Sequence, residues 1–203
     1  MDDPTWILHP PANKGREAMA YLTYIIAHYH DLPSTILFLH PHRKAMPQSW
    51  HNDAEDNDNV KSVRSLRLDY VHKHGYANLR CAEAPGCPDE IQPFRGDPER
   101  IFEVPVADAY VALFGGNHST VPRTIAVACC AQFAVSKEQV LARPRSDYLH
   151  YRQWLLDTDL HDQLSGRVLE YAWHIIFGKD PVWCPDTGDC LCQQFGRCGG
   201  FGF

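Results

Sequence analysis

The chain has 203 residues, 44% of them hydrophobic, which is enough for one α/β domain with a substantial core. Its formal net charge of −6 gives no general attraction to phosphate backbones, so nucleic acid is not an expected partner on this ground. The first thirty residues contain no signal peptide or membrane span by pattern, because His9, Pro10 and Pro11 interrupt their apolar run. We therefore expect a single soluble domain, with a core over 13–178.

The first predicted element is a helix over 13–33. Its apolar side chains recur at three-and-four spacing, Asn13 is the expected cap, and Pro33 ends the pattern. A short apolar stretch, "TILFLH", follows over 35–40 and is typical of a central strand covered by helices on both faces. The next residues, up to about position 59, are rich in Pro, Asn and Asp and predict a long loop.

A second helix is predicted over 60–75, with Gly75 as its end signal. The segment 101–116 is compatible with either a strand or a helix. Residues 125–135 read as one apolar strand leading into a helix capped by Ser136, and 145–178 supply two more helices. This order predicts an α/β fold with a central mixed sheet covered by helices, and an irregular cysteine-rich tail over 179–203.

The eight cysteines fall into three sets. Cys81 and Cys87 bracket a Pro-Gly turn that could bring them within bridging distance, and Cys129 and Cys130 are adjacent. The tail holds the other four, and the pattern is compatible with disulfides, a structural zinc site or free buried thiols. Disulfides would indicate a secretory lumen or extracellular location, whereas a chain that truly starts at Met1 without a signal would be cytoplasmic.

Histidines cluster where the strand over 35–40 ends. His40 and His42 alternate on an extended backbone and so face the same way, beside Arg43. The following loop adds His51 and Asp53, which would complete a nitrogen and oxygen set for a divalent metal such as manganese, magnesium or zinc, or for iron. The alternative is that these histidines only bond to loop carbonyls.

The start of the first helix is a candidate anion site. Free amides and the helix dipole favour a phosphate or carboxylate there, and Lys14 and Arg16 add positive charge beside Asn13 and Glu17. The segment lacks the glycine spacing and the Lys-Ser/Thr pair of a P-loop. An ordinary capped helix with solvated charges is the alternative.

Glu170 and His174 lie four residues apart in "GRVLEYAWHIIF" and are predicted to share a helix face, with Arg167 one turn earlier. Glu170 is the preferred general base, tuned by His174 or Arg167, and a structural ion pair is the alternative. A Cys130 nucleophile is disfavoured, because nothing in this apolar segment lowers a thiol pKa. Gln132, just beyond, is assigned with Arg167 to substrate binding.

The blocks "NKGREAMAYLTYII", "LPSTILFLHPHR", "WHND", "GYANLRC", "CCAQFAVS" and "SGRVLEYAWHIIFGK" follow one another ahead of the cysteine-rich tail. In this order they resemble the fungal family catalogued as domain-of-unknown-function family 3431, from Asn13 to Cys198. The biochemistry of that family is largely undefined. The resemblance therefore places the chain among relatives without implying a particular activity.

The chain is also more loosely similar to glycosyltransferases of the A-type fold. That likeness implies a late carboxylate beside the acceptor and an Asp-x-Asp motif that holds a metal and the sugar-nucleotide diphosphate. Here Asp56 and Asp58 have the spacing but lie in a polar loop. Under this likeness, either the histidine cluster has replaced the metal motif or nucleotide-sugar chemistry has been lost.

The resulting functional prediction is a group-transfer enzyme of secretory or secondary metabolism that transfers a sugar from a nucleotide sugar to a small-molecule or glycan substrate. Lys14, Arg16 and Arg43 would offset the diphosphate charge, and Glu170 or His51 would deprotonate the acceptor. One alternative is peptide formation from aminoacyl-tRNA, as in cyclodipeptide synthases, which would make tRNA a partner. Another is a non-catalytic binding module.

Overall fold

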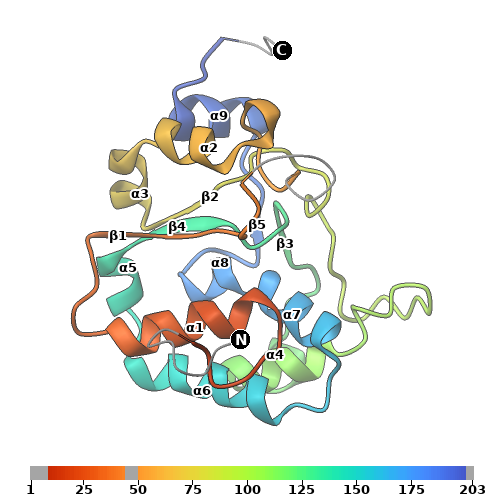
Figure 1. Ribbon diagram of the computed structural model, residues 1–203. Helices are drawn as coiled ribbons and strands as arrows, with labels where there is room; N and C mark the ends of the chain where they lie inside the picture. Colours follow the sequence, from red (N-terminus) through yellow and green to blue (C-terminus); the bar gives the residue numbers. More distant parts are fainter. Residues whose placement is uncertain (1–8, 44–49, 200–203) are drawn as a thin grey trace.

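The computed structural model describes residues 9–43 and 50–199. A small sheet lies between two layers of helices (Figure 1). The lower layer, as viewed there, holds α1 (Glu17–His28), α4 (Val106–Phe114), α5 (Lys137–Leu141), α6 (Arg145–Asp157), α7 (Asp162–Glu170) and α8 (Trp173–Ile176). The upper layer holds α2 (Asn59–Ser65), α3 (Leu68–His74) and α9 (Thr187–Phe195).

Two small sheets replace the single mixed sheet that the sequence predicts. The larger contains β1 (Thr35–Phe38), β4 (Phe133–Ser136) and β2 (Tyr76–Asn78) in the order β1-β4-β2, and both pairings are antiparallel. The smaller pairs β3 (Ala126–Val127) with β5 (Val182–Trp183) in parallel. The chain is mixed α/β as predicted, but β1 is an edge strand and β4 the central one. Only alternate residues of β1 are buried, whereas all four of β4 are.

The antiparallel pairing brings three chain segments to one edge of the sheet. Phe38 at the end of β1 and Asn78 at the end of β2 both lie opposite Phe133, where β4 begins. The residues that follow β1 and β2 therefore lie beside those that precede β4. This edge is where histidines and cysteines far apart in sequence meet.

Aromatic packing holds the lower layer to the sheet. Phe133 is fully buried, and its ring lies 5.1–5.9 Å from five others, those of Tyr21, Phe38, Tyr76, Trp173 and Phe177. Helix α1 packs mainly on α6. Ser136 caps α5 as predicted, because its hydroxyl accepts the backbone N–H of Gln139 at 3.1 Å. The segment 101–116, compatible with two states in sequence, contains α4.

The upper layer departs more from the sequence pattern. The helix predicted over 60–75 is divided into α2 and α3, because Leu66 is extended and the N–H of Arg67 bonds to the carbonyl of Gln194 instead of continuing a helix. Gly75 ends α3 at φ 75°, as predicted. The 3₁₀ helix η1 (Glu55–Asn57) lies in the predicted loop.

The tail is not irregular, since it forms β5 and α9. All eight cysteines are paired, as Cys81–Cys190, Cys87–Cys184, Cys129–Cys130 and Cys192–Cys198. The prediction of disulfides is thus confirmed. The predicted bridge between Cys81 and Cys87 is wrong, because each of these cysteines is joined to a cysteine of the tail. Among the described residues, no helix combines the length and apolar character needed to cross a bilayer.

Candidate functional site

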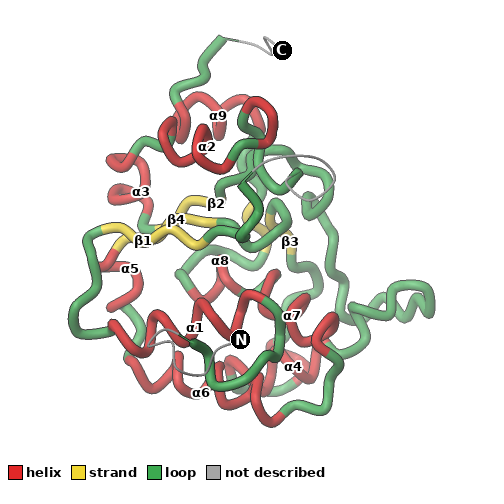
Figure 2. Tube along the Cα trace, viewed as in Figure 1, coloured by secondary structure: helices red, strands yellow, loops and turns green. Residues whose placement is uncertain are grey.

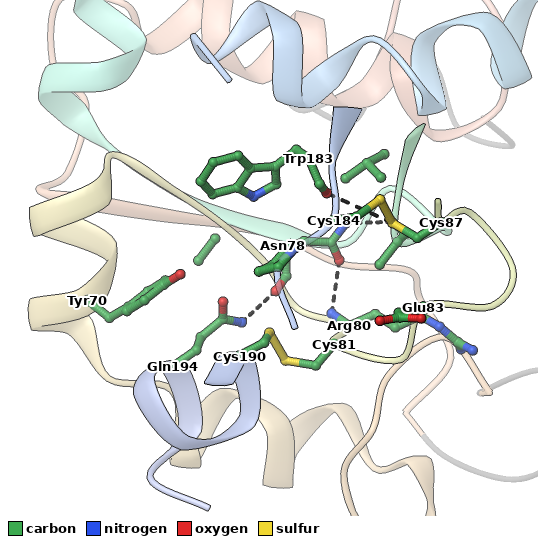
Figure 3. Close-up of a pocket in the computed structure, with 14 residues that line it drawn as sticks. Tyr70, Asn78, Arg80, Cys81, Glu83, Cys87, Trp183, Cys184, Cys190 and Gln194 are labelled. Carbon is green, nitrogen blue, oxygen red and sulfur yellow. Dashed lines mark hydrogen bonds between the residues drawn. A yellow bond between two sulfur atoms is a disulfide. The ribbon is translucent and has the colours of Figure 1, made fainter. Parts of the chain in front are cut away.

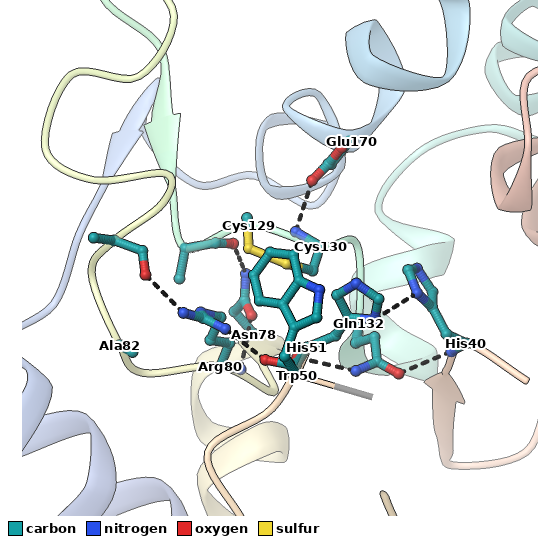
Figure 4. Close-up of a disulfide and its surroundings, with 12 residues drawn as sticks. His40, Trp50, His51, Asn78, Arg80, Ala82, Cys129, Cys130, Gln132 and Glu170 are labelled. Carbon is teal, nitrogen blue, oxygen red and sulfur yellow. Dashed lines mark hydrogen bonds between the residues drawn. A yellow bond between two sulfur atoms is a disulfide. The ribbon is translucent and has the colours of Figure 1, made fainter. Parts of the chain in front are cut away.

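The edge where β1 and β2 end and β4 begins gathers most of the polar residues singled out in the sequence. We call this group the strand-end site; it consists of Arg16, Glu17, His40, His51, Gln132, Arg167, Glu170 and the Cys129–Cys130 disulfide. Figure 4 shows Glu170 facing the disulfide, and Gln132 between His51 and His40.

The strand predicted over 125–135 is interrupted at this site. Cys130 and Ala131 have φ angles of 89° and 49°, a region that residues with a side chain rarely adopt. The disulfide between Cys129 and Cys130 spans the first part of this turn. The turn takes the backbone out of the sheet, so that the N–H of Cys130 donates to the Glu170 carboxylate rather than to a neighbouring strand.

Glu170 is held on both sides at the end of α7. Its Oε1 accepts the Cys130 N–H at 2.8 Å, and its Oε2 lies 3.1 Å from Nη1 of Arg167. Burial raises the pKa of Glu170, while Arg167 and the Cys130 amide act in the opposite direction. This carboxylate is therefore nearly enclosed, oriented by two donors and easier to protonate than a solvated one.

Glu17, in the first turn of α1, is the second carboxylate of the strand-end site. Burial raises its pKa to about 7; the nearby charge of Glu170 adds to this, and Arg16 and Arg167 oppose it. Glu17 is therefore partly protonated near neutral pH. Two carboxyl groups and two guanidinium groups thus act on one another in this small region.

The start of α1 does not follow the predicted cap. The N-cap is Arg16, at φ 55° and without a side-chain cap bond, and Asn13 is exposed four residues before the helix. A tertiary contact sets this start: the backbone N–H of Gly15 donates to Asp162 at 3.2 Å. A side chain at Gly166 would come within 3.3 Å of Arg16, so the small residue lets α1 dock on α7.

Lys14 does not face the predicted anion site. Its ammonium donates to the carbonyls of Leu156 and Thr158, where α6 ends. Cationic side chains commonly satisfy free carbonyls at a helix end in this way. Of the predicted anion-binding residues at the start of α1, the structure therefore brings Arg16 and Glu17 to the strand-end site, and not Asn13 or Lys14.

His40 and His51 form a close pair. Their Nδ1 atoms are 3.2 Å apart, and Gln132 fixes the backbone of both, since its Oε1 accepts the His40 N–H at 2.8 Å and its Nε2 donates to the His51 carbonyl at 3.0 Å. Burial lowers the pKa of His40 to about 4, and burial also lowers the pKa of His51. Both rings are neutral near pH 7, so one Nδ1 donates to the other.

The other predicted ligands point elsewhere. The Asp53 carboxylate accepts the backbone N–H groups of Cys81 and Ala82, at 2.5 and 2.9 Å. His42 is exposed, and Arg43 pairs with Asp58 at 3.5 Å. Over 9–43 and 50–199, no three His, Cys, Asp or Glu side chains are placed to hold a metal ion. The set His40, His42 and Asp53 thus does not fit a divalent metal.

His174 lies outside the site. The helix predicted to carry Glu170 and His174 on one face ends at Glu170, Tyr171 adopts a ψ of 7°, and a separate α8 begins at Trp173. The His174 ring is fully buried, and its Nε2 lies 3.0 Å from the carbonyl of Pro181. It therefore positions the segment that leads into β5 rather than tuning Glu170.

Arg80 is a residue that the sequence interpretation missed. It is largely buried; its guanidinium donates to the carbonyls of Trp50, at 2.8 Å, and Ala84, at 2.6 Å, and it stacks over the Trp50 ring. These contacts fix the loop that carries His51. The available signal was an arginine directly after the short, mostly apolar stretch "YANL"; a buried arginine there needs partners for its charge.

Two pockets lie near these residues. One borders the strand-end site at Arg167 and is otherwise lined mainly by apolar side chains of α4, α7 and α8, among them Tyr110, Phe114 and Tyr171. The other lies between β2 and α9, beside Cys81–Cys190 and Cys87–Cys184 (Figure 3). In the second pocket Asn78 and Gln194 are bonded within the protein, which indicates a structural role.

The family model described as protein of unknown function (DUF3431) matches residues 1–193. The chain belongs to this family. The match confirms the resemblance found in the sequence, and every residue of the strand-end site lies within it. Neither the curated proteins nor the solved structures contain a match to this member of DUF3431.

Proposed function

We propose that this chain is a group-transfer enzyme that uses the strand-end site to transfer a sugar from a nucleotide sugar to an acceptor hydroxyl. The observation that carries the proposal is the gathering of two partly buried carboxyl groups with raised pKa, Glu17 and Glu170, beside two guanidinium groups, Arg16 and Arg167. Carboxyl groups with a perturbed pKa beside guanidinium groups are candidates for acid–base catalysis next to an anionic substrate.

The acid–base step is assigned to Glu170. In this step the acceptor oxygen bonds to the sugar anomeric carbon, the bond from that carbon to the phosphate oxygen breaks, and the nucleoside diphosphate leaves with the electron pair. Glu170 takes the proton from the acceptor hydroxyl. The raised pKa of Glu170 favours this transfer, because a base with a pKa closer to the working pH removes a proton more readily.

Arg16 and Arg167 are assigned to the donor diphosphate. Guanidinium groups bind phosphate oxygens through paired N–H donors, and the charge that develops on the leaving diphosphate needs stabilisation. Arg16 is exposed and so accessible to a ligand, whereas Arg167 is half-buried against Glu170. The neutral pair His40 and His51 lies beside Arg16, and His51 is assigned to hydrogen bonding with the substrate.

The acceptor is assigned to the surface beside Arg167 and Glu170, where the Tyr171 ring lies 5.9 Å from the Arg167 guanidinium. The adjoining apolar pocket, lined by Tyr110, Phe114 and Tyr171, has a volume of only about 10 Å³, so it holds no substrate group unless these side chains move.

The likeness to A-type glycosyltransferases remains part of this proposal. Its support is the order of sequence blocks rather than the sheet, because β1, β4 and β2 are antiparallel. The Asp56-x-Asp58 spacing does not add to it, since Asp58 caps α2 and Asp56 pairs with Lys61 at 3.0 Å. The proposal therefore stands on the site, and no step in it passes through a metal.

The test uses the disulfide-intact full chain and a panel of uridine and guanosine diphosphate sugars. We expect at least one nucleotide sugar to raise the melting temperature of the chain. Without an acceptor, water should act as a poor substitute, so that the nucleoside diphosphate is released slowly. Liquid chromatography with mass spectrometry measures the release. If no nucleotide sugar stabilises the wild-type chain or is cleaved by it, the proposal is wrong.

Three variants separate the roles. E170Q keeps the shape and should lower release about 10²- to 10⁴-fold, while binding is retained. R167K should mainly weaken donor binding, because it loses paired hydrogen bonding to phosphate. E99Q changes an exposed loop carboxylate and should match wild type. Equal rates for E170Q and E99Q would remove Glu170 from the mechanism.

A further inference from the structure

An exposed tripeptide between α4 and β3 has the sequence Asn117-His118-Ser119. Asn-x-Ser/Thr, with x other than proline, is the acceptor motif for N-linked glycans. It occurs once in the 203 residues. All three residues are exposed, which is the surface location that such a modification requires.

The hydrogen bonds that fix the Asn117 side chain in its turn use the amide oxygen and not the amide nitrogen, which is the atom that reacts. Asn117 caps the 3₁₀ helix η2 (His118–Thr120), and its Oδ1 accepts the N–H of Ser119 at 2.9 Å and the Ser119 hydroxyl at 2.6 Å. Both bonds use the amide oxygen. N-linked modification takes place at the amide nitrogen, Nδ2, so a glycan there is compatible with the folded turn.

The cysteines supply an independent argument about compartment. All eight are in disulfides, two of which join segments about a hundred residues apart in sequence, with separations of 109 and 97. Structural disulfides of this kind form in oxidising compartments, and the secretory route is the one that also carries the glycosylation machinery. The motif and the disulfides thus point to the same route.

We propose that Asn117 is an N-glycosylation site of this protein in the secretory pathway. The donor is a lipid-diphosphate-linked oligosaccharide. Nδ2 of Asn117 bonds to the anomeric carbon of the first N-acetylglucosamine, the bond from that carbon to the phosphate oxygen breaks, and the lipid diphosphate leaves with the electron pair. One amide proton is released, and nothing is oxidised or reduced.

The surroundings give the glycan a role. The exposed ring of Phe94 lies 6.3 Å from the His118 ring, and Arg123 stacks over its face. A sugar at Asn117 would lie beside this apolar ring and reduce its contact with water. Glycans commonly improve solubility by covering such surface.

The experiment expresses the full chain behind a secretion leader in a eukaryotic host. We expect a heterogeneous added mass that peptide N-glycosidase F removes, leaving aspartate at position 117 in the peptide map. N117Q and S119A should both lack this mass, and S119T should retain it because threonine preserves the motif. Intact mass under non-reducing conditions verifies four disulfides in each sample.

A secreted wild-type chain with four disulfides and an unmodified Asn117 would overturn the proposal. The same holds if S119A keeps the added mass, because the motif would then not direct it. The result does not depend on sugar transfer by the strand-end site, so failure of the proposed function and failure of this inference are distinguishable. S119A tests whether the motif directs the modification, without altering Asn117 itself.

Discussion

The two helical layers are stabilised by different means. The lower layer packs thirty buried residues and many aromatic rings into one cluster with the sheet. The upper layer has a cluster of eight buried residues, two of them the bonded cysteines Cys81 and Cys190. Three of the four disulfides lie in or beside the upper layer, and the fourth lies at the sheet edge.

The difference shows what a small apolar cluster needs. Hydrophobic burial scales with the area removed from water, and a cluster of this size cannot offset the entropy of ordering three helices and a tail. Covalent links lower the entropy of the unfolded chain and so stabilise a layer that burial alone would not. The strand-end site lies between the two layers, with residues from α1, α7 and the loop after β1.

The largest expected effect is from removing both bridges that join 81–87 to the tail. The variant C81S/C87S/C184S/C190S should lose about 5 to 8 kcal/mol of unfolding free energy, because neither the long loop nor the short loop between the two bridges is closed any longer. Hydrogen exchange should then show α9 and α3 open while α1 and α6 stay protected. Simultaneous loss of protection in all helices would break the comparison.

Single removals give the matched control. C81S/C190S should cost only about 3 kcal/mol, because Cys87–Cys184 still closes nearly the same loop. Additive costs for the two bridges, measured by urea unfolding, would contradict this account.

Phe133 tests the lower layer. F133A removes a fully buried ring that contacts five others and should cost about 3 to 5 kcal/mol, whereas F133L should cost clearly less. Unlike the cysteine variant, F133A should lower protection against hydrogen exchange in α1 and α8 while all four disulfides remain intact. Retained protection there would show that the aromatic cluster is not what holds this layer.

Glu17, in α1 of the lower layer, should make the stability of the protein depend on pH. Its pKa of about 7 in the folded chain exceeds the ordinary value of 4.5, so the folded state binds more protons between these values and stability falls as pH rises through them. Between about pH 5 and pH 8, wild type should lose about 1 to 3 kcal/mol more than E17Q. Urea unfolding at both values measures this, with E99Q as control. No difference from E17Q would place Glu17 in solvent, and the opposite sign would mean that Arg16 and Arg167 lower its pKa more than burial raises it.

The smallest effect concerns the cap of α5. S136A removes the bond to the Gln139 N–H and should cost about 1 kcal/mol, whereas S136T should keep most of it. Thermal unfolding compares the two. A loss as large as that of F133A would mean that α5 depends on more than its cap.

Local signals predicted local structure well. Three-and-four spacing indicated the body of α1, Ser136 marked the start of α5, and Gly75 ended α3, because caps and periodicity act within a few residues. The tertiary contacts of Arg67 with α9, and of Gly15 with α7, moved helix boundaries in ways that no local pattern carries.

The candidate site was predicted in part. His40, His51 and Glu170 were singled out as polar residues beside apolar segments, and the antiparallel edge brings them together. The turn at Cys130 and Ala131 could not be predicted, because the same letters read as a buried strand and only the bond to Cys129 and two positive φ angles distinguish it. Asp53 and His174 looked like site residues, yet both bond to backbone groups: Asp53 to the N–H of Cys81, far along the chain, and His174 to the carbonyl of Pro181.

The bridges Cys81–Cys190 and Cys87–Cys184 are nested, one inside the other along the chain. The connection from β2 to α4 is almost entirely loop (Figure 2), and it exposes Ile101 and Val104. A protease that cuts this loop near Ile101 or Val104 would therefore leave two fragments linked by both bridges. On an electrophoresis gel the cut protein would run as one band until a reductant is added, and then as two. A gel run without reductant would therefore not reveal cleavage at this place.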